Sequence, residues 1–117
     1  MRLRKRAEFL TTQRRGQRVH GQHLILIAAK SRAAGLRLGI TASKKVGNAV
    51  ARNLVKRRLR EIFRARQFFL SQSADLVVIA RNSATRASFA ELREDFELSL
   101  RRALELLAKG TKKQKKS

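Results

Sequence analysis

The chain has 117 residues, of which 29 are Lys or Arg and 8 are Asp or Glu, so its formal net charge is +21. This length fits one domain with one core, and the 43% hydrophobic content excludes a wholly disordered polycation. The charge predicts a polyanionic partner, because releasing counterions from many phosphates favours binding to nucleic acid. There is no Cys, which excludes disulfides, thiolate metal sites and Cys nucleophiles.

An anionic membrane is the other polyanion that this charge allows, but the sequence argues against it. No apolar run approaches the roughly 20 residues that cross a bilayer. No signal-peptide core follows the basic N-terminus. We therefore expect a cytoplasmic protein with no membrane partner and no obligate protein partner.

The N-terminal residues 3–15 are predicted to form a short helix. Leu3, Ala7 and Leu10 recur at helical spacing and would share one side of it. Gly16 would end the helix, since glycine is common just past a helix terminus.

Three apolar runs predict strands. HLILIAA (23–29) is apolar throughout and has strand length. LRLGITAS (36–43) alternates, so its apolar side chains would point one way, as in a half-buried strand. DLVVIAR (75–81) is β-branched and apolar, which is typical of a buried strand.

Residues 48–69 are predicted to form a helix with an apolar and a polar side. At about 100° per residue, the side that would pack on a sheet carries Ala51, Leu54, Val55, Leu59 and Ile62. The other side carries two rows: Arg52, Lys56 and Arg60 in the first, and Asn53, Arg57, Arg60 and Arg64 in the second. Phe63 would lie near the border, and Arg58 and Arg66 fall on the apolar side, from which they would snorkel outward.

Two interpretations of this cationic side remain open. Like charges four residues apart repel by a few tenths of a kcal/mol per pair, and Glu61 is the only acid in the run. Such a face costs stability unless phosphates neutralise it, and the Arg fork matches phosphate well. An ordinary solvated face is the alternative.

The turn before this helix is a candidate anion site. Lys44 and Lys45 flank it, Gly47 permits a tight turn and Asn48 is a suitable N-cap. Backbone amides at a helix start favour anions. An ordinary turn with surface lysines is the alternative.

The last helix has the clearest sequence signals. Ser88 and Glu91 form a capping box at its start. The apolar residues that follow at steps of three and four are Phe89, Leu92, Phe96, Leu100, Ala103, Leu104 and Leu107. Gly110 would end the helix. We therefore expect a single domain over 1–110 and a disordered Lys-rich tail over 111–117.

The order of elements predicts an α+β fold. A helix, two or three strands, a helix, a strand and a final helix would form an α-β sandwich with a small sheet. We identify no repeat and no linker that would divide the chain.

Neither the acids nor the histidines predict catalysis by this chain. Metal-assisted hydrolysis of phosphodiesters needs clustered carboxylates. The four acids of the last helix are scattered around it, with arginines nearby to pair them: Glu91, Glu94, Asp95 and Glu97. A His pair can act as general acid and base, but His20 and His23 have no evident third partner and are expected to be ordinary exposed residues. We expect no catalytic residue and no metal ligand.

The run LGITASKKVGNAVARNLVKRRLREIFR closely resembles the protein subunit of bacterial ribonuclease P. The family's R-N-x-x-K-R-x-x-R signature is matched by Arg52, Asn53, Lys56, Arg57 and Arg60. The preceding S-K-K-x-G-N-A-V is matched by Ser43, Lys44, Lys45, Gly47, Asn48, Ala49 and Val50. The resemblance extends to RLRKRAEF, to DLVVIARNSA and to the final helix, so it covers nearly the whole chain outside the tail.

The resemblance implies a fold and a function. It implies an αβββαβα-like order with a mixed sheet, in which the Arg-Asn helix crosses between parallel strands. It implies a subunit that binds the catalytic RNA of ribonuclease P and the 5′ leader of precursor tRNA. The holoenzyme cleaves that precursor at the tRNA 5′ end, with the chemistry in the RNA and its Mg²⁺ and no cofactor bound by the chain alone.

The resemblance also implies which residues contact each RNA. The expected contacts to the catalytic RNA are Lys44, Lys45, Asn48, Arg52, Asn53, Lys56, Arg57, Arg60 and Arg64. The expected leader contacts are Phe9, Gln13, Arg14 and Ile27, in a cleft between the first helix and the sheet.

The leader cleft is where the sequence departs from the family pattern. The family often has aromatic residues where this chain has Gln13 and Ile27, so stacking on unpaired bases is reduced here. Phe9 matches one aromatic position, although it fits the core equally well. A structural RNA-binding protein, such as a ribosomal component or RNA chaperone, is the alternative function.

Overall fold

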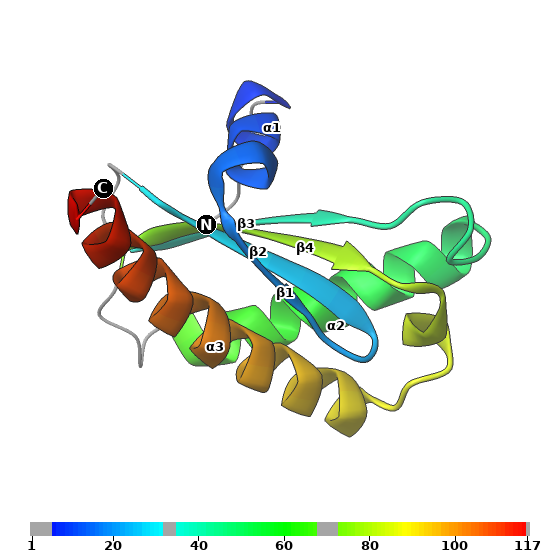
Figure 1. Cartoon of the computed structure of the whole chain (residues 1–117). Coiled ribbons are helices and arrows are strands. Elements are labelled where there is room, and N and C mark those ends of the chain that lie inside the picture. The colour runs from blue at the N-terminus through cyan, green and yellow to red at the C-terminus, as the bar shows by residue number, and fades with distance from the viewer. Residues whose placement is uncertain (1–5, 32–34, 68–72, 117) are drawn as a thin grey trace.

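The computed structural model describes residues 6–31, 35–67 and 73–116, without the side chains of Arg6, Glu8, Gln67 and 110–116. Its elements in chain order are α1 (Arg6–Arg15), β1 (Gln17–His20), β2 (Leu24–Lys30), β3 (Leu36–Thr41), α2 (Ala49–Gln67), β4 (Ala74–Ala80), the short 3₁₀ helix η1 (Asn82–Thr85) and α3 (Phe89–Lys116) (Figure 1). The predicted αβββαβα order is confirmed.

The four strands form one mixed sheet in the order β1-β2-β4-β3. β2 pairs antiparallel with both β1 and β4, whereas β3 pairs parallel with β4. Parallel neighbours need a crossover connection, and α2 provides it between β3 and β4. The predicted crossover helix in a mixed sheet is therefore confirmed.

The helices lie on both faces of the sheet, as expected for an α-β sandwich. α2 and α3 cover one face, and α1 stands on the other (Figure 1). The larger core lies under α2 and α3, where Leu26, Leu38 and Val78 of the sheet meet Leu59 and Phe96 of the helices. A smaller cluster lies under α1 and is built around Ile27 and Val77.

The strands show how far periodicity predicts burial. Leu36, Leu38 and Ala42 of the alternating run all join the larger core, as predicted. The residue pattern did not indicate β1, the third strand that the family resemblance implies before α2, because Val19 is the only buried residue of its four and so gives no period-two signal.

α1 contacts the sheet through a different side from the predicted one. Leu3 lies outside the described residues, while Ala7 and Leu10 are exposed, Leu10 at 43%. Phe9 and Thr12 face the sheet instead. The helix ends at Gly16 as predicted, with a hydrogen bond of 2.9 Å from the Gly16 amide to the Thr12 carbonyl. Glycine is needed there, since an added Cβ would lie 2.4 Å from Ile27 Cγ2.

α3 begins as predicted but ends later. The Ser88 amide donates to Glu91 Oε1 at 2.8 Å, and the Glu91 amide donates to Ser88 Oγ at 3.1 Å, which confirms the capping box. Phe89 is 37% exposed and does not join the predicted buried stripe. The helix continues through Gly110 to Lys116. A helical glycine costs only about 1 kcal/mol relative to alanine, so it does not have to end a helix. A disordered tail over 111–117 stays a prediction.

The capping box gives a prediction about pH. The hydrogen bonds from the Ser88 amide and hydroxyl hold the pKa of Glu91 below its ordinary value of 4.5. A carboxylate with a lowered pKa stabilises the fold above the ordinary value, and this stabilisation is lost as the pH falls through the lowered value. The melting temperature of the wild type should therefore exceed that of Glu91→Gln at pH 7, and the difference should shrink below about pH 4.5.

Glu94→Gln is the matched control, since it removes one exposed negative charge of α3 outside the box. A difference between wild type and Glu91→Gln that stays constant from neutral to acid pH would contradict the role of the box.

Candidate nucleic-acid interface

The polar side of α2 separates into an exposed row and a half-buried row. Asn53, Arg57 and Arg64 are exposed. The half-buried residues border the core-facing side of the helix; they are Arg52, Lys56 and Arg60. Phe63 was predicted at the boundary between the two sides, but it is buried. The two predicted rows therefore differ in exposure. The first is half-buried, whereas the second, apart from Arg60, which was predicted in both rows, faces solvent.

Arg52 has a feature that its sequence position does not reveal. Its Nε atom is enclosed and has no hydrogen-bond partner among the described residues. Buried polar atoms are nearly always hydrogen-bonded, so this donor would gain from an acceptor brought by a ligand.

The turn before α2 presents its lysines beside the first turn of the helix. The Val46 amide donates to the Ser43 carbonyl at 3.0 Å, and Val46 itself is buried, which anchors the turn. Lys44 and Lys45 are exposed. Asn48 Oδ1 accepts from the Ala51 amide at 2.9 Å, which confirms the predicted N-cap.

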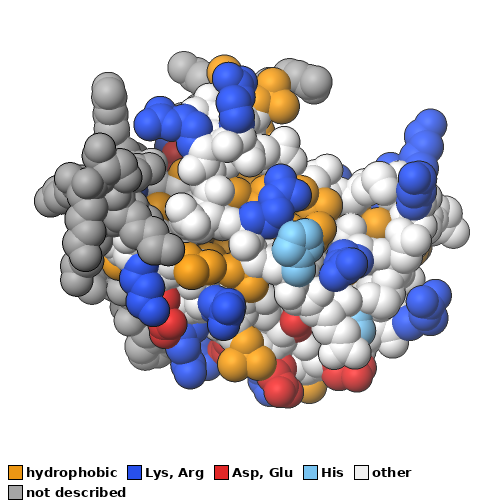
Figure 2. Space-filling model, viewed as in Figure 1, with side chains coloured by type: hydrophobic (Ala, Val, Ile, Leu, Met, Phe, Trp, Pro, Cys, Tyr) orange, Lys and Arg blue, Asp and Glu red, His pale blue; other side chains and the backbone are white. Residues whose placement is uncertain are grey.

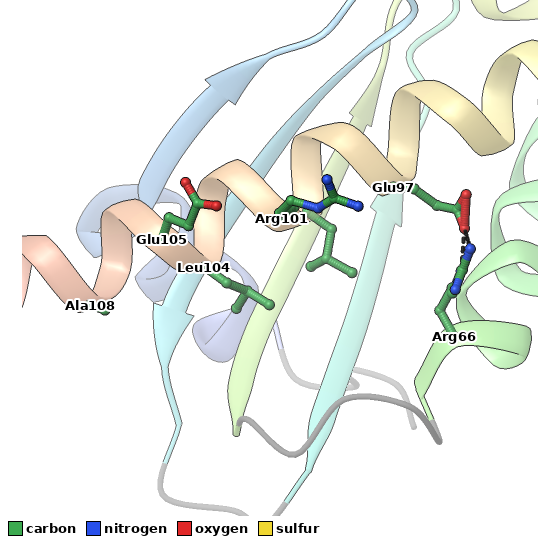
Figure 3. Close-up of a pocket in the computed structure, with 7 residues that line it drawn as sticks. Arg66, Glu97, Arg101, Leu104, Glu105 and Ala108 are labelled. Carbon is green, nitrogen blue, oxygen red and sulfur yellow. Dashed lines mark hydrogen bonds and ion pairs between the residues drawn. The ribbon is translucent and has the colours of Figure 1, made fainter.

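The two arginines on the apolar side of α2 connect it to neighbouring segments. Arg58 Nη1 lies 3.4 Å from the Ala87 carbonyl, and Arg66 forms an ion pair with Glu97 of α3. Beside this pair is a groove of about 480 Å³ (Figure 3). The groove is lined by Arg66, Glu97, Leu100, Arg101, Leu104, Glu105 and Ala108. Arg58 and Arg66 thus join α2 to neighbouring segments, whereas the cations of the exposed row face solvent.

Three of the four acids predicted to scatter around α3 have separate structural roles. Glu91 closes the capping box and Glu97 pairs with Arg66. Asp95 accepts from the amides of Gln22 and His23 at 3.0 and 2.7 Å, and so holds the turn between β1 and β2. Within 6–31, 35–67 and 73–109, no three His, Asp or Glu side chains are grouped to hold a metal ion.

The two histidines differ in environment, although both were predicted to be exposed. His20 is exposed. His23 is only 8% exposed, and its Nδ1 lies 2.9 Å from Ser83 Oγ. The expectation of two ordinary exposed histidines was therefore wrong for His23, because η1 and α3 enclose the turn that carries it.

α1 covers part of its sheet face and places the predicted leader residues at different depths. Phe9 packs against Ile27 and Val77 and lies over Gly39, where an added Cβ would come within 2.3 Å of its ring. Ile27 is 0% exposed, so it supports Phe9 from below and offers no surface to a ligand. Gln13 is half-buried and Arg14 is exposed.

The rest of this face is an open strip that runs across all four strands. Thr41 is in register with Ile79, Ile79 with Ile25, and Ile25 with His20, so these side chains share one face. Ile25 and Ile79 are half-buried and His20 is exposed. Figure 2 shows hydrophobic side chains below α1 with Lys and Arg around them, while most visible acids lie lower, over α3. We call the four residues in register, Thr41, Ile79, Ile25 and His20, the open strip.

β1 places two exposed residues on the α1 face of the sheet, a position that was not predicted for them. Arg18 and His20 are exposed on this edge strand, and alternation places both on the α1 face, in register with Ile27 and Ile25. Only the pairing with β2 shows which face of the sheet these side chains occupy, because the hydrophobic pattern of a four-residue strand is too short to predict it.

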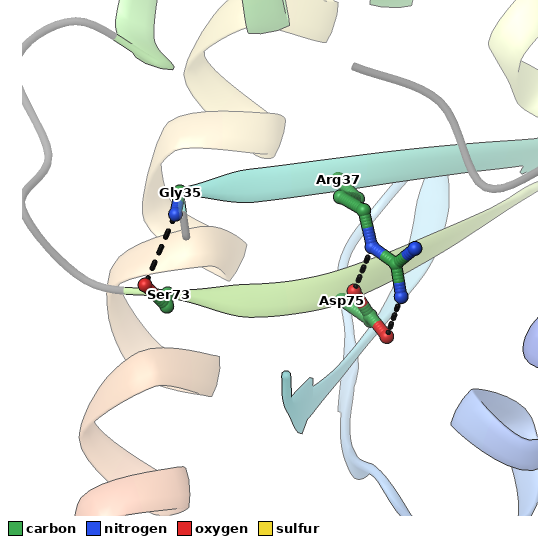
Figure 4. A network of polar contacts seen from close by, with 4 residues as sticks. All are labelled: Gly35, Arg37, Ser73 and Asp75. Carbon is green, nitrogen blue, oxygen red and sulfur yellow. Dashed lines mark hydrogen bonds and ion pairs between the residues drawn. The ribbon is translucent and has the colours of Figure 1, made fainter. Parts of the chain in front are cut away.

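The one carboxylate placed by register on the α1 face of β4 is neutralised. Arg37 Nε lies 2.7 Å from Asp75 Oδ1, and Nη2 lies 2.8 Å from Oδ2, in a bidentate pair between β3 and β4 (Figure 4). A hydrogen bond of 3.0 Å from the Gly35 amide to Ser73 Oγ joins the starts of the same strands. Asp75 therefore adds little repulsion toward an anion on this face.

The sequence matches one protein family and many of its members. The model of the family described as "Ribonuclease P" matches residues 1–104. The ribonuclease P protein component of Desulfosudis oleivorans is 46% identical over 91 residues, which covers 78% of this chain and 75% of that protein. That of Erythrobacter litoralis is 42% identical over 107 residues, covering 88% and 85%.

Solved structures show the same fold. The Staphylococcus aureus RNase P protein superposes with a TM-score of 0.81 at 32% identity, covering 87% of this chain and 94% of that one. The Thermotoga maritima RNase P protein gives a TM-score of 0.78 at 33% identity, covering 87% and 96%.

Fold and surface together define a small, strongly basic α-β sandwich with an outward-facing cationic crossover helix. The chain belongs to the ribonuclease P protein family, whose members are components of the holoenzyme that matures tRNA 5′ ends and that contains an RNA partner. Among the described helices, none is long and apolar enough to cross a membrane.

The contact of Phe9 with Gly39 gives a testable prediction. Gly39→Ala should lower the free energy of unfolding by about 1–3 kcal/mol, the range for overpacking, because the new methyl group displaces the Phe9 ring. In a Phe9→Ala background the same substitution should cost much less. Urea unfolding of the four proteins of this double-mutant cycle measures the coupling. An equal cost in both backgrounds would show that the clash lies elsewhere.

Proposed function

We propose that this chain binds the catalytic RNA of ribonuclease P through α2 and the turn before it. The contacts are the nine residues implied by the family resemblance, namely Lys44, Lys45, Asn48, Arg52, Asn53, Lys56, Arg57, Arg60 and Arg64. The observation that carries the proposal is the exposed row of Asn53, Arg57 and Arg64 on α2, together with the exposed Lys44 and Lys45 of the turn that precedes the helix. The half-buried cations and the enclosed Nε of Arg52 would add hydrogen bonds from the side of the row.

The distribution of charge supports phosphate as the ligand. Three acids of α3 have other partners: Glu91 closes the capping box, Asp95 accepts from the β1–β2 turn and Glu97 pairs with Arg66. They therefore do not neutralise the exposed row of α2. Arg57 and Arg64 face solvent, where their guanidinium groups can bind phosphate oxygens in pairs.

We propose that the second ligand, the 5′ leader of precursor tRNA, lies on the α1 face of the sheet. The open strip provides an apolar floor beside Phe9, and Arg14 and Arg18 are exposed cations on the adjoining α1 and β1. A floor of this kind with flanking cations suits a single strand, whose bases contact the floor while its phosphates contact the cations. Gln13 lies half-buried on α1, and Ile27 acts from beneath by supporting Phe9.

The hydrolysis itself would belong to the RNA and its Mg²⁺, in the cytoplasm. Three of the four α3 carboxylates considered for metal-assisted hydrolysis, Glu91, Asp95 and Glu97, have structural partners, so this chain would supply affinity and position. Family membership favours this function over that of a ribosomal component or RNA chaperone.

The first experiment is cleavage of a 5′-extended tRNA precursor at low Mg²⁺ by a bacterial ribonuclease P RNA. We expect cleavage only when RNA and protein are both present. Cleavage by the protein alone would move the chemistry into this chain. Tight RNA binding without stimulation would instead favour a structural RNA-binding role.

The exposed row predicts the salt dependence of assembly. Arg57→Ala and Arg64→Ala should each weaken binding to the catalytic RNA and flatten the plot of log K against log salt by about one unit. Each substitution removes one phosphate contact and the counterion release that accompanies it.

Arg102→Ala is the matched control, because it removes an exposed arginine from α3 instead of α2. Unchanged slopes for the two α2 variants, or an equal change for Arg102→Ala, would remove this face from the RNA contact.

A further inference from the structure

The α1 face of the sheet has few rings on which a base could stack. The sequence contains no Trp and no Tyr. Phe63 and Phe96 are buried in the larger core, on the opposite face, and Phe89 lies at the start of α3. Among the described residues, the rings on the α1 face are therefore those of Phe9 and His20.

We propose that His20 is the second stacking ring of the leader surface, in the role that Gln13 does not fill. This inference rests on the leader site proposed above and names a residue that determines how the site holds its ligand. A histidine ring presents a flat face on which an unpaired base stacks, as the rings of Phe, Tyr and Trp do.

The position of His20 in the sheet suits this role. Phe9 lies over Gly39 of β3 and packs against the cluster of Val77 and Ile27 on the two inner strands. His20 stands on β1, the edge strand on the far side of β2. Ile25 and Ile79 lie on the two inner strands. Phe9, Ile25 and Ile79 pack against the same two residues, and His20 is the register partner of Ile25. The apolar floor therefore lies next to both rings.

The backbone that carries His20 is held firmly. The Gly21 amide donates to the Leu24 carbonyl at 2.8 Å and closes the turn directly after His20. Arg81 Nη1 donates to the Gly21 carbonyl at 2.9 Å, and Asp95 binds the next two amides from α3. A side chain on such a fixed turn is well placed to bind, because little ordering is needed when the ligand arrives.

The neighbours of His20 also favour an RNA strand as the ligand. Its register partner Ile25 gives the ring an apolar flank, and Arg18, two residues earlier on the same face, is exposed. A base stacked on His20 would thus have a cation nearby for its phosphate.

The test measures the binding of precursor tRNA and of leaderless tRNA to the assembled holoenzyme. His20→Ala should weaken precursor binding roughly tenfold, which is the scale for one stacked base, and should leave leaderless tRNA unaffected. His20→Phe keeps a ring and should retain wild-type binding. His20→Lys places a cationic group at this position without a ring and should behave like His20→Ala.

An abasic scan of the leader separates stacking from a structural effect. With the wild type, removing the base at one leader position should weaken binding, and with His20→Ala this sensitivity should disappear. Equal melting temperatures of the variants would show that the fold is intact.

Other outcomes would overturn the inference. Unchanged leader affinity in His20→Ala would exclude His20 from the site, and rescue by His20→Lys but not by His20→Phe would replace stacking by charge. If the wild-type holoenzyme itself bound precursor and leaderless tRNA equally, the proposed leader site would fail before His20 was tested.

Discussion

The arrangement of the whole molecule depends on β4 being paired on both sides. It bonds to β2 antiparallel and to β3 parallel, and six of its seven residues are buried. A parallel pairing cannot be closed by a tight turn, so the chain between β3 and β4 has to cross the sheet as a helix. That helix is α2. Its cationic side faces outward because Val55, Leu59 and Ile62 hold the other side against the core.

The same strand separates two surfaces with different properties. Its alternate side chains enter the larger core under α2 and α3 and the smaller cluster under α1. α1 is short and touches the sheet mainly through Phe9 and Thr12, so it leaves the open strip uncovered. The cationic row of α2 and the open strip therefore belong to opposite layers of one sandwich, and two RNA segments would not compete for them.

Acidic and basic side chains occupy different positions in this fold. Carboxylates of α3 and β4 are used inside the fold, in the capping box, the β1–β2 turn and the pairs with Arg37 and Arg66. The cations greatly outnumber the acids, and those of the exposed row of α2 and of the turn before it face solvent. A fold with such self-repulsion is stabilised by a polyanion, so folding and assembly with RNA would support each other.

Local patterns in the sequence were enough for the features that depend on near neighbours. The capping box of Ser88 and Glu91, the N-cap at Asn48 and the alternation of β3 all follow from residues a few positions apart, and hydrogen bonds or burial confirm each of them. Features that depend on contacts between distant segments could not be read in this way. The exposure of Ala7 and Leu10, the burial of His23 and Ile27, and the edge position of His20 were decided by packing. The partners of His23, for example, are Ser83 and Asp95, which come from 60 and 72 positions away. Composition and motif therefore predict a polyanionic partner and the helix that would bind it, while only the folded sheet shows which side chains of the α1 face are left uncovered, because that depends on packing between distant segments.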